Sequence, residues 1–143
     1  MPLYQVIAPQ DLLSDDLRHR IASEITRIHT TNTGAPALFV NVLFQDVPAG
    51  RLFTAGKPSR TTIIVGEIRE GRELAVRQAI LADLAEMWTA QTGQSDGELL
   101  MAIKEVDPRV AMEAGMIMPA PGNEAAWFAE HEDRLRDLGL TVP

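Results

Sequence analysis

The sequence predicts an α+β fold: two β-α-β repeats forming a four-stranded sheet with two helices on one face, then a C-terminal tail with a short helix. Residues 15–31 and 72–92 each carry an apolar stripe at helical spacing, and the second stripe lies 59 residues after the first. The paired positions are Leu17 and Val76, Ile21 and Ile80, Ile25 and Leu84, and Ile28 and Met87. Gly34 and Gly93 follow the two stripes, where glycine commonly ends a helix.

Each helical stretch has a strand candidate on either side. Residues 3–8 and 61–68 precede the helices, and residues 38–44 and 99–106 follow them. A crossover helix of this length joins parallel strands, so the repeat halves span about 2–45 and 61–106. The identities Val6/Val65, Arg18/Arg77 and Ile21/Ile80 fit the same offset. The alternative is chance, but one offset aligns both stripes and both stop signals without a gap.

The remaining segments lie outside the repeat. Residues 45–60 contain several prolines and glycines and are expected to be mostly turn. In the tail, residues 107–143, Asn123 is expected to cap a short helix that runs to about Leu138 and closes at Gly139. Trp127 and Phe128 would dock this helix on an apolar surface, which in an oligomer could belong to a neighbouring subunit. The whole chain, 1–143, is read as one domain.

Composition excludes several classes of function. The chain has 143 residues, 45% of them hydrophobic and 23% charged, which is ordinary for a globular protein. It has no cysteine, and His19, His29 and His131 are far apart in sequence, so we expect neither a metal nor a cofactor. A net charge of −7 argues against nucleic acid. No apolar run approaches the roughly 20 residues of a membrane span, and the N-terminus does not resemble a signal peptide, which predicts a cytoplasmic protein.

Pro2 is the first candidate catalytic residue. Removal of the initiator methionine would leave its secondary amine free, and an α-amino group titrates at about pH 8. Such a group can act as a general base or a general acid. The alternative is that Pro2 is only a stable beginning of the chain. A retained Met1 would turn the nitrogen into an amide and abolish this role.

Arg69 and Arg72 are candidates for binding an acid. They lie where the third strand meets the second helix, and guanidinium groups near a helix N-terminus suit a carboxylate. Two neighbouring cations would also lower the pKa of a nearby proline amine. The alternative is a solvated turn in which Glu70 and Glu73 balance the arginines. His29 could reach a cleft beside the sheet or be a half-buried structural histidine, and Glu113 could simply face solvent.

Together these residues resemble the tautomerase superfamily, and within it the branch of cis-3-chloroacrylic acid dehalogenase. The resemblance covers nearly the whole chain. It rests on the Pro2 start, Gln10-Asp11-x-Leu13, His29, Phe44-Gln45-x-x-Pro48-Ala49-Gly50-x-x-Phe53, Arg69-Glu70-Gly71-Arg72, Glu113-x-Gly115 and Pro119-x-Pro121-Gly122-x-Glu124-x-x-Trp127-Phe128.

The resemblance implies two β-α-β units and a homotrimer that acts on a small carboxylate. Pro2 would transfer the proton, Arg69 and Arg72 would bind the substrate carboxylate, and His29 would position substrate or water. Glu113 would activate water in hydrating and dehalogenating members. The chain departs from the family at Ala102, where the dehalogenase has a tyrosine, and at Ala35, where a threonine is expected.

Loss of these hydroxyl donors should weaken demanding chemistry most. We therefore expect a tautomerase that moves a proton between the enol and keto forms of a small 2-oxo or 2-hydroxy-alkenoic acid. One alternative is a dehalogenase or hydratase of three-carbon unsaturated acids. Another is a non-catalytic ligand-binding or assembly module, since fold alone does not decide function. A third is a degenerate member with vestigial activity.

Overall fold

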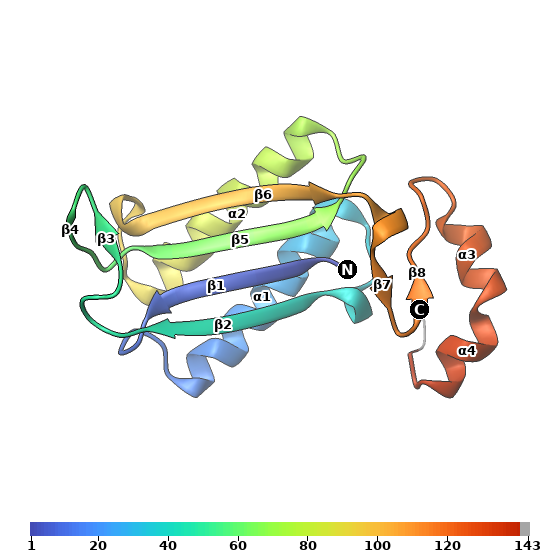
Figure 1. The fold of residues 1–143 in the computed structure, drawn as a ribbon, viewed down its shortest axis with the longest axis horizontal. Helices are drawn as coiled ribbons and strands as arrows, with labels where there is room; N and C mark the ends of the chain where they lie inside the picture. Colours follow the sequence, from blue (N-terminus) through green and yellow to red (C-terminus); the bar gives the residue numbers. More distant parts are fainter. Residues whose placement is uncertain (141–143) are drawn as a thin grey trace.

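The computed structural model describes residues 1–140 and has the predicted repeat. The first unit is β1 (Leu3–Pro9), α1 (Asp15–Thr33) and β2 (Asn41–Val47); the second is β5 (Thr62–Arg69), α2 (Leu74–Thr92) and β6 (Leu99–Val106). The strand order is β2-β1-β5-β6, with β1 parallel to β2, β5 parallel to β6, and β1 antiparallel to β5. Both helices cover one face of this sheet (Figure 1), so the predicted fold class is confirmed.

Several element bounds differ from the expectation. β2 begins three residues later than expected, because residues 37–39 form a 3-10 turn that buries Phe39. Residues 45–60 were expected to be mostly turn, but β2 runs on to Val47. The rest of this segment consists of turns around a short hairpin of β3 (Phe53–Thr54) and β4 (Lys57–Pro58). Helix α2 begins at Leu74 rather than at Arg72, so Arg72 lies in the loop before it.

The tail is more elaborate than one capped helix. It contains the hairpin of β7 (Met112–Glu113) and β8 (Met116–Ile117), followed by α3 (Glu124–Glu130) and α4 (Glu132–Asp137). The single helix expected here is wrong, because His131 leaves helical geometry at φ −106° and ψ 11°. Asn123 precedes α3, but its side chain makes no capping hydrogen bond. Gly139 follows α4 with a positive φ of 70°.

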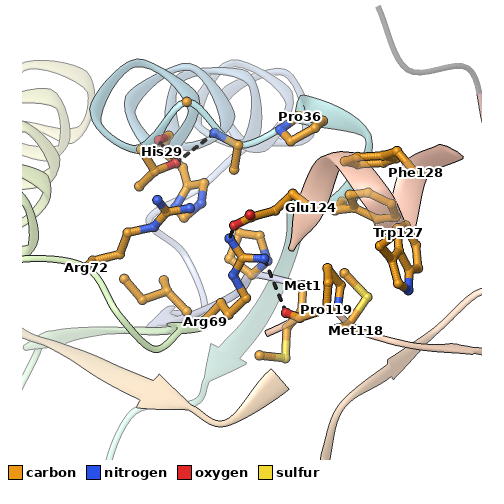
Figure 2. Close-up of a pocket in the computed structure, with 16 residues that line it drawn as sticks. Met1, His29, Pro36, Arg69, Arg72, Met118, Pro119, Glu124, Trp127 and Phe128 are labelled. Carbon is orange, nitrogen blue, oxygen red and sulfur yellow. Dashed lines mark hydrogen bonds and ion pairs between the residues drawn. The ribbon is translucent and has the colours of Figure 1, made fainter. Parts of the chain in front are cut away.

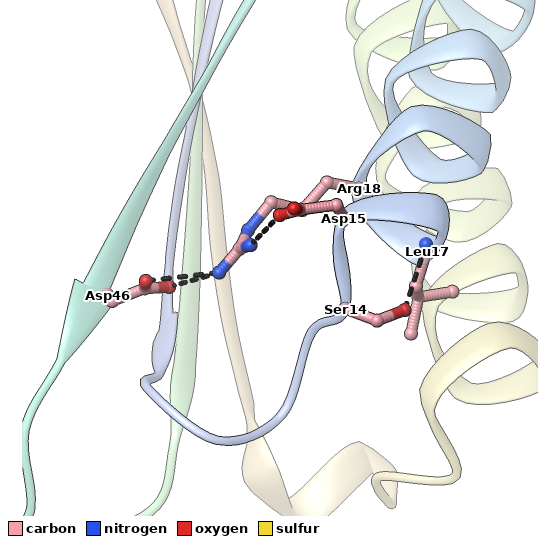
Figure 3. A network of polar contacts seen from close by, with 5 residues as sticks. All are labelled: Ser14, Asp15, Leu17, Arg18 and Asp46. Atoms are coloured by element: carbon pink, nitrogen blue, oxygen red, sulfur yellow. Dashed lines mark hydrogen bonds and ion pairs between the residues drawn. The ribbon is translucent and has the colours of Figure 1, made fainter.

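The duplication extends to polar contacts that join each helix to its own second strand. Ser14 caps α1 by accepting a hydrogen bond from the Leu17 amide, and Arg18 then bridges Asp15 and Asp46 on β2 (Figure 3). In the second unit, Arg77 pairs with Glu105 on β6 at 3.1 Å. Both members of this pair lie 59 positions after Arg18 and Asp46.

The offset of 59 fails in the first strands of the two units. Val6 is fully buried against the helices, whereas Val65 is only half-buried and lies on the other face of the sheet. Neighbouring residues of a strand point to opposite faces of the sheet. A shift of the alignment by one residue therefore moves every side chain to the other face. The identity Val6/Val65 is therefore not a structural equivalence, although Phe44 and Ile103, in the second strands, do face the same core.

Two apolar clusters hold the described residues together. The larger lies between the sheet and the helices and includes Tyr4, Ile21, Ile80 and Trp88. The smaller joins the tail to the 3-10 turn, and its buried members are Phe39, Met116, Met118, Trp127 and Leu135. Trp127 and Phe128 thus dock on their own chain. Within residues 1–140, no helix is both long and apolar enough to cross a membrane.

Candidate active site

A cavity of about 320 Å³ lies at the end of the sheet where β1 begins and β5 ends (Figure 2). The antiparallel pairing of β1 with β5 brings Leu3 opposite Glu67, and so places Pro2 near Arg69. The C-terminal tail supplies one wall. The lining residues are Met1, Pro2, His29, Thr33, Gly34, Ala35, Pro36, Phe39, Ile68, Arg69, Arg72, Met118, Pro119, Glu124, Trp127 and Phe128.

Pro2 is buried at the wall of the cavity, and Met1 precedes it. The α-amino group of Met1 donates a hydrogen bond to the carboxylate of Glu113. Burial, and secondly the positive charge of Arg69, lower the pKa of this amino group to about 5. These two effects favour the neutral, proton-accepting form of the Met1 amine. While Met1 is attached, the nitrogen of Pro2 is an amide.

Arg69 and Arg72 both line the cavity, but their surroundings differ. The side chain of Arg69 is 13% exposed; its Nη2 pairs with Glu124, and its Nη1 donates to the carbonyl of Pro119 at 3.4 Å. Its counterion thus comes from the tail and not from Glu70 or Glu73. Arg72 has no ion pair among residues 1–140. Burial and the charge of Arg69 lower the pKa of Arg72, and Glu124 partly offsets this effect.

His29 comes from the C-terminal part of α1 and is 3% exposed. Its Nδ1 lies 2.9 Å from the hydroxyl of Tyr4, which is on the buried face of β1. Burial, followed by the charges of Arg72 and of the N-terminus, lowers the pKa of His29 to about 4. The imidazole is therefore neutral near pH 7. Burial raises the pKa of Tyr4, so its hydroxyl keeps its proton.

Glu113 reaches the first residue of the chain without lining the cavity. It lies on β7; one carboxylate oxygen accepts from the Met1 amino group, and the other accepts from the side-chain amide of Asn41 at 3.0 Å. The structure thus brings Pro2, His29, Arg69 and Arg72 to one cavity, and Glu113 to its edge. Ala35 lines this cavity, whereas Ala102 is exposed on the sheet face opposite the helices.

Sequence reasoning missed three parts of this site. Tyr4, the only tyrosine of the chain, was not among the candidate residues, although its position in the first expected strand was a signal that it could reach the neighbouring helix. Glu124 entered only as part of a motif, and nothing in its spacing linked it to Arg69, 55 residues earlier. No feature of the sequence indicated that Asn41 would contact Glu113.

The second unit closes the equivalent space with larger side chains. Trp88 and Gln94 stand 59 positions after His29 and Ala35, and both are buried. The indole of Trp88 donates to Oε1 of Gln94 at 2.8 Å, and the hydroxyl of Thr62 donates to the same oxygen at 2.6 Å. The smaller His29 and Ala35 leave room beside Pro2. The cavity therefore depends on where the two repeats differ.

The charges and the lining of the cavity are suited to a small acid with an apolar end. Guanidinium groups and a neutral imidazole meet a wall formed by Phe39, Met118, Trp127 and Phe128. Among the described residues there is no group of three or more histidine, aspartate or glutamate side chains placed to hold a metal ion. A guanidinium binds a carboxylate through charge-assisted hydrogen bonds, and the aromatic side chains suit an apolar tail.

The chain matches the model of a known protein family. The family model Tautomerase_3, described as "Putative oxalocrotonate tautomerase enzyme", matches residues 1–132. No curated protein matches. The crystal structure of native Ps01740 is 40% identical, covers 78% of this chain and 99% of its own, and has a TM-score of 0.76.

Two further solved structures share the fold. That of N1, a member of the cis-3-chloroacrylic acid dehalogenase family, is 26% identical over 94% of this chain and 99% of its own, with a TM-score of 0.86. The R7 fused 4-OT, an asymmetric trimer, is 24% identical over 87% of this chain and 98% of its own, with a TM-score of 0.74.

Proposed function

We propose that this chain, which belongs to the Tautomerase_3 family, catalyses enol–keto proton transfer on a small 2-oxo or 2-hydroxy-alkenoic acid, with Pro2 as the proton carrier. The observation that carries the proposal is the place of Pro2 in one cavity with His29, Arg69 and Arg72. Removal of Met1 would expose the imino nitrogen of Pro2 there. The burial and the charge of Arg69 that lower the pKa of the Met1 amine would also favour a neutral proline, which is a base.

The reaction then needs one proton and no water. The substrate carboxylate binds Arg72, and the nitrogen of Pro2 takes the proton of the enol hydroxyl. The oxygen becomes the keto carbonyl, while the electrons of the carbon–carbon double bond form a new bond from C3 to the proton that Pro2 returns. His29, neutral near pH 7, hydrogen-bonds the oxygen on which charge develops.

The first test is the state of the N-terminus. The intact mass of the purified protein should lack one methionine, because retained Met1 leaves no free nitrogen on Pro2. Pro2→Ala should lower turnover of phenylenolpyruvate by about 100-fold or more, with thermal unfolding unchanged. Unchanged turnover would instead favour a ligand-binding or assembly module.

A second candidate function is hydration or dehalogenation of a three-carbon unsaturated acid. Two observations favour it: the similarity to N1, and the approach of Glu113 to the beginning of the chain, where a carboxylate could activate water. Chloride release from cis-3-chloroacrylate should distinguish the two functions. A rate comparable to phenylenolpyruvate ketonisation, and lost in Glu113→Gln, would replace the tautomerase proposal.

We also infer that the chain assembles as a homotrimer. Leu43 and Leu100 are 46% and 57% exposed on the sheet face that the helices leave uncovered. They lie on the two outer strands, and Ile63 and Val65 are half-buried on the same face between them. Apolar surface left uncovered on one face commonly marks a subunit contact. The R7 fused 4-OT is a trimer with the same fold. Light scattering on the purified protein should give three times the mass of one chain, and a monomer would contradict the inference.

A further inference from the structure

The two arginines of the cavity are not equivalent acceptors for an acid. Arg69 already has a carboxylate partner, Glu124, and a second contact with the carbonyl of Pro119. Arg72 lines the same cavity without an ion pair among residues 1–140. An incoming carboxylate can therefore bind Arg72 directly, but it reaches Arg69 only by displacing Glu124.

Glu124 approaches Arg69 from the side of the apolar wall, and its charge also acts on Arg72, whose pKa it raises. Figure 2 shows Arg72 beside His29, whereas Glu124 lies over Arg69, on the side where α3 places Trp127 and Phe128. An acid whose carboxylate binds Arg72 would extend its other end toward Glu124 and these aromatic side chains. A methyl or phenyl group is accommodated there, while a second carboxylate meets a negative charge.

The local charges keep Glu124 ionised. Partial burial alone would raise the pKa of Glu124, but backbone hydrogen bonds and the neighbouring Arg69 outweigh it, and the net pKa is lowered. The carboxylate is thus negative at neutral pH and repels a second anion across a partly enclosed site, where water screens charges less than in bulk solvent.

We propose that Glu124 is a specificity-determining residue that makes this site select monocarboxylates over dicarboxylates. By neutralising Arg69, it leaves a single carboxylate-binding position at Arg72 and excludes acids with a negatively charged distal end. The inference rests on the proposed function for the class of substrate, but it concerns binding and can be tested without turnover.

The test compares two ligands by calorimetry, 2-oxopentanoate and 2-oxoglutarate. Both are five-carbon 2-oxo acids, and they differ only in a terminal methyl or carboxylate. The wild type should bind 2-oxopentanoate about tenfold more tightly, because like charges at close range oppose the second acid. In Glu124→Gln, the affinity for 2-oxoglutarate should rise about tenfold or more, because the negative charge at the distal end of the site is gone. The affinity for 2-oxopentanoate should change less than about threefold.

Glu130→Gln is the matched control. It removes the same charge from an exposed position of the same helix, α3, outside the cavity, and should leave the preference unchanged. An equal gain for both ligands, a wild-type preference for 2-oxoglutarate, or binding of neither ligand would overturn the proposal. If the two ligands bind as expected but the protein shows no turnover, the proposed function is rejected and the role of Glu124 is kept. Turnover that depends on Pro2, with no effect of Glu124→Gln on selectivity, would reject only the role of Glu124.

Discussion

The hydroxyl of Tyr4 lies 2.9 Å from Nδ1 of His29, and this buried contact joins β1 to α1 beside the cavity. The pKa of His29 is lowered to about 4, so its ring is neutral and carries one N–H. A buried donor needs a partner, and among the described residues the hydroxyl of Tyr4 finds one in Nδ1 of His29. We therefore infer that the hydroxyl donates to Nδ1. This arrangement places the ring proton on Nε2. His29 can then donate a hydrogen bond to a substrate oxygen.

Tyr4→Phe should therefore reduce activity while keeping the aromatic ring in the core. Without the hydroxyl, the orientation of His29 and the position of its proton are no longer held, and we expect turnover to fall about tenfold. The free energy of unfolding should fall by about 1–2 kcal/mol, because Nδ1 of a buried ring loses its partner. Steady-state kinetics and urea unfolding measure the two effects. Unaltered turnover in a variant of normal stability would show that Tyr4 does not position His29.

The lowered pKa of His29 predicts how stability depends on pH. Below about pH 6.5 the unfolded chain protonates this residue, whereas the folded chain resists protonation until about pH 4. The contribution of His29 to the free energy of unfolding is therefore present above pH 6.5 and is lost as the pH falls toward 4. Between neutral pH and about pH 5 the loss should reach roughly 2 kcal/mol.

Comparison with His29→Gln isolates this effect from the carboxylates that titrate in the same range. Chemical unfolding at several pH values should give a flatter profile for the variant. Parallel profiles for the two proteins would mean that His29 titrates alike in the folded and unfolded chains.

Gly66 makes room for the ring of Tyr4 across the β1–β5 pair. The two residues are opposite each other, and a Cβ at position 66 would lie 2.6 Å from Cε1 of Tyr4 and 2.8 Å from Cδ1 of Ile103. Gly66→Ala should lower the free energy of unfolding by about 1–3 kcal/mol and reduce turnover, since Tyr4 must shift.

Gly97→Ala is the control for this substitution. Its Cβ would meet only Oγ of Ser95, at 3.7 Å, and we expect a change within about 0.5 kcal/mol. If both alanine variants behave alike in thermal unfolding, close packing of Tyr4 on Gly66 does not contribute to stability.

Gln94 should matter for stability and not for substrate binding. Its Oε1 accepts from Trp88 and Thr62, and its Nε2 donates to the carbonyl of Arg60 at 2.9 Å. Gln94→Leu would leave two buried donors unpaired and should cost about 2–4 kcal/mol. Gln78→Leu, at an exposed position of α2, supplies the control. A rise in KM with normal stability would contradict this assignment.

Local patterns determined most of the fold. Apolar residues at helical spacing, each series followed by a glycine, were enough to place α1 and α2, because side-chain period and helix stop signals are properties of short segments. The pairs Arg18–Asp46 and Arg77–Glu105 are not local, and they repeat because each helix packs in the same way against the second strand of its own unit. The one-residue slip between β1 and β5 was not visible, since a strand with apolar residues on both faces has no distinct burial pattern.

By itself, the sequence determined which residue types were present to do chemistry: an early proline, two arginines before a helix, a histidine and a glutamate. Only the tertiary structure decided their partners. Tyr4 meets His29 across 25 residues, Arg69 meets Glu124 across 55, and Met1 meets Glu113 across 112. The physical reason is that periodicity reports which face of its own element a residue occupies. The distance between two faces depends on strand order and on where the tail packs.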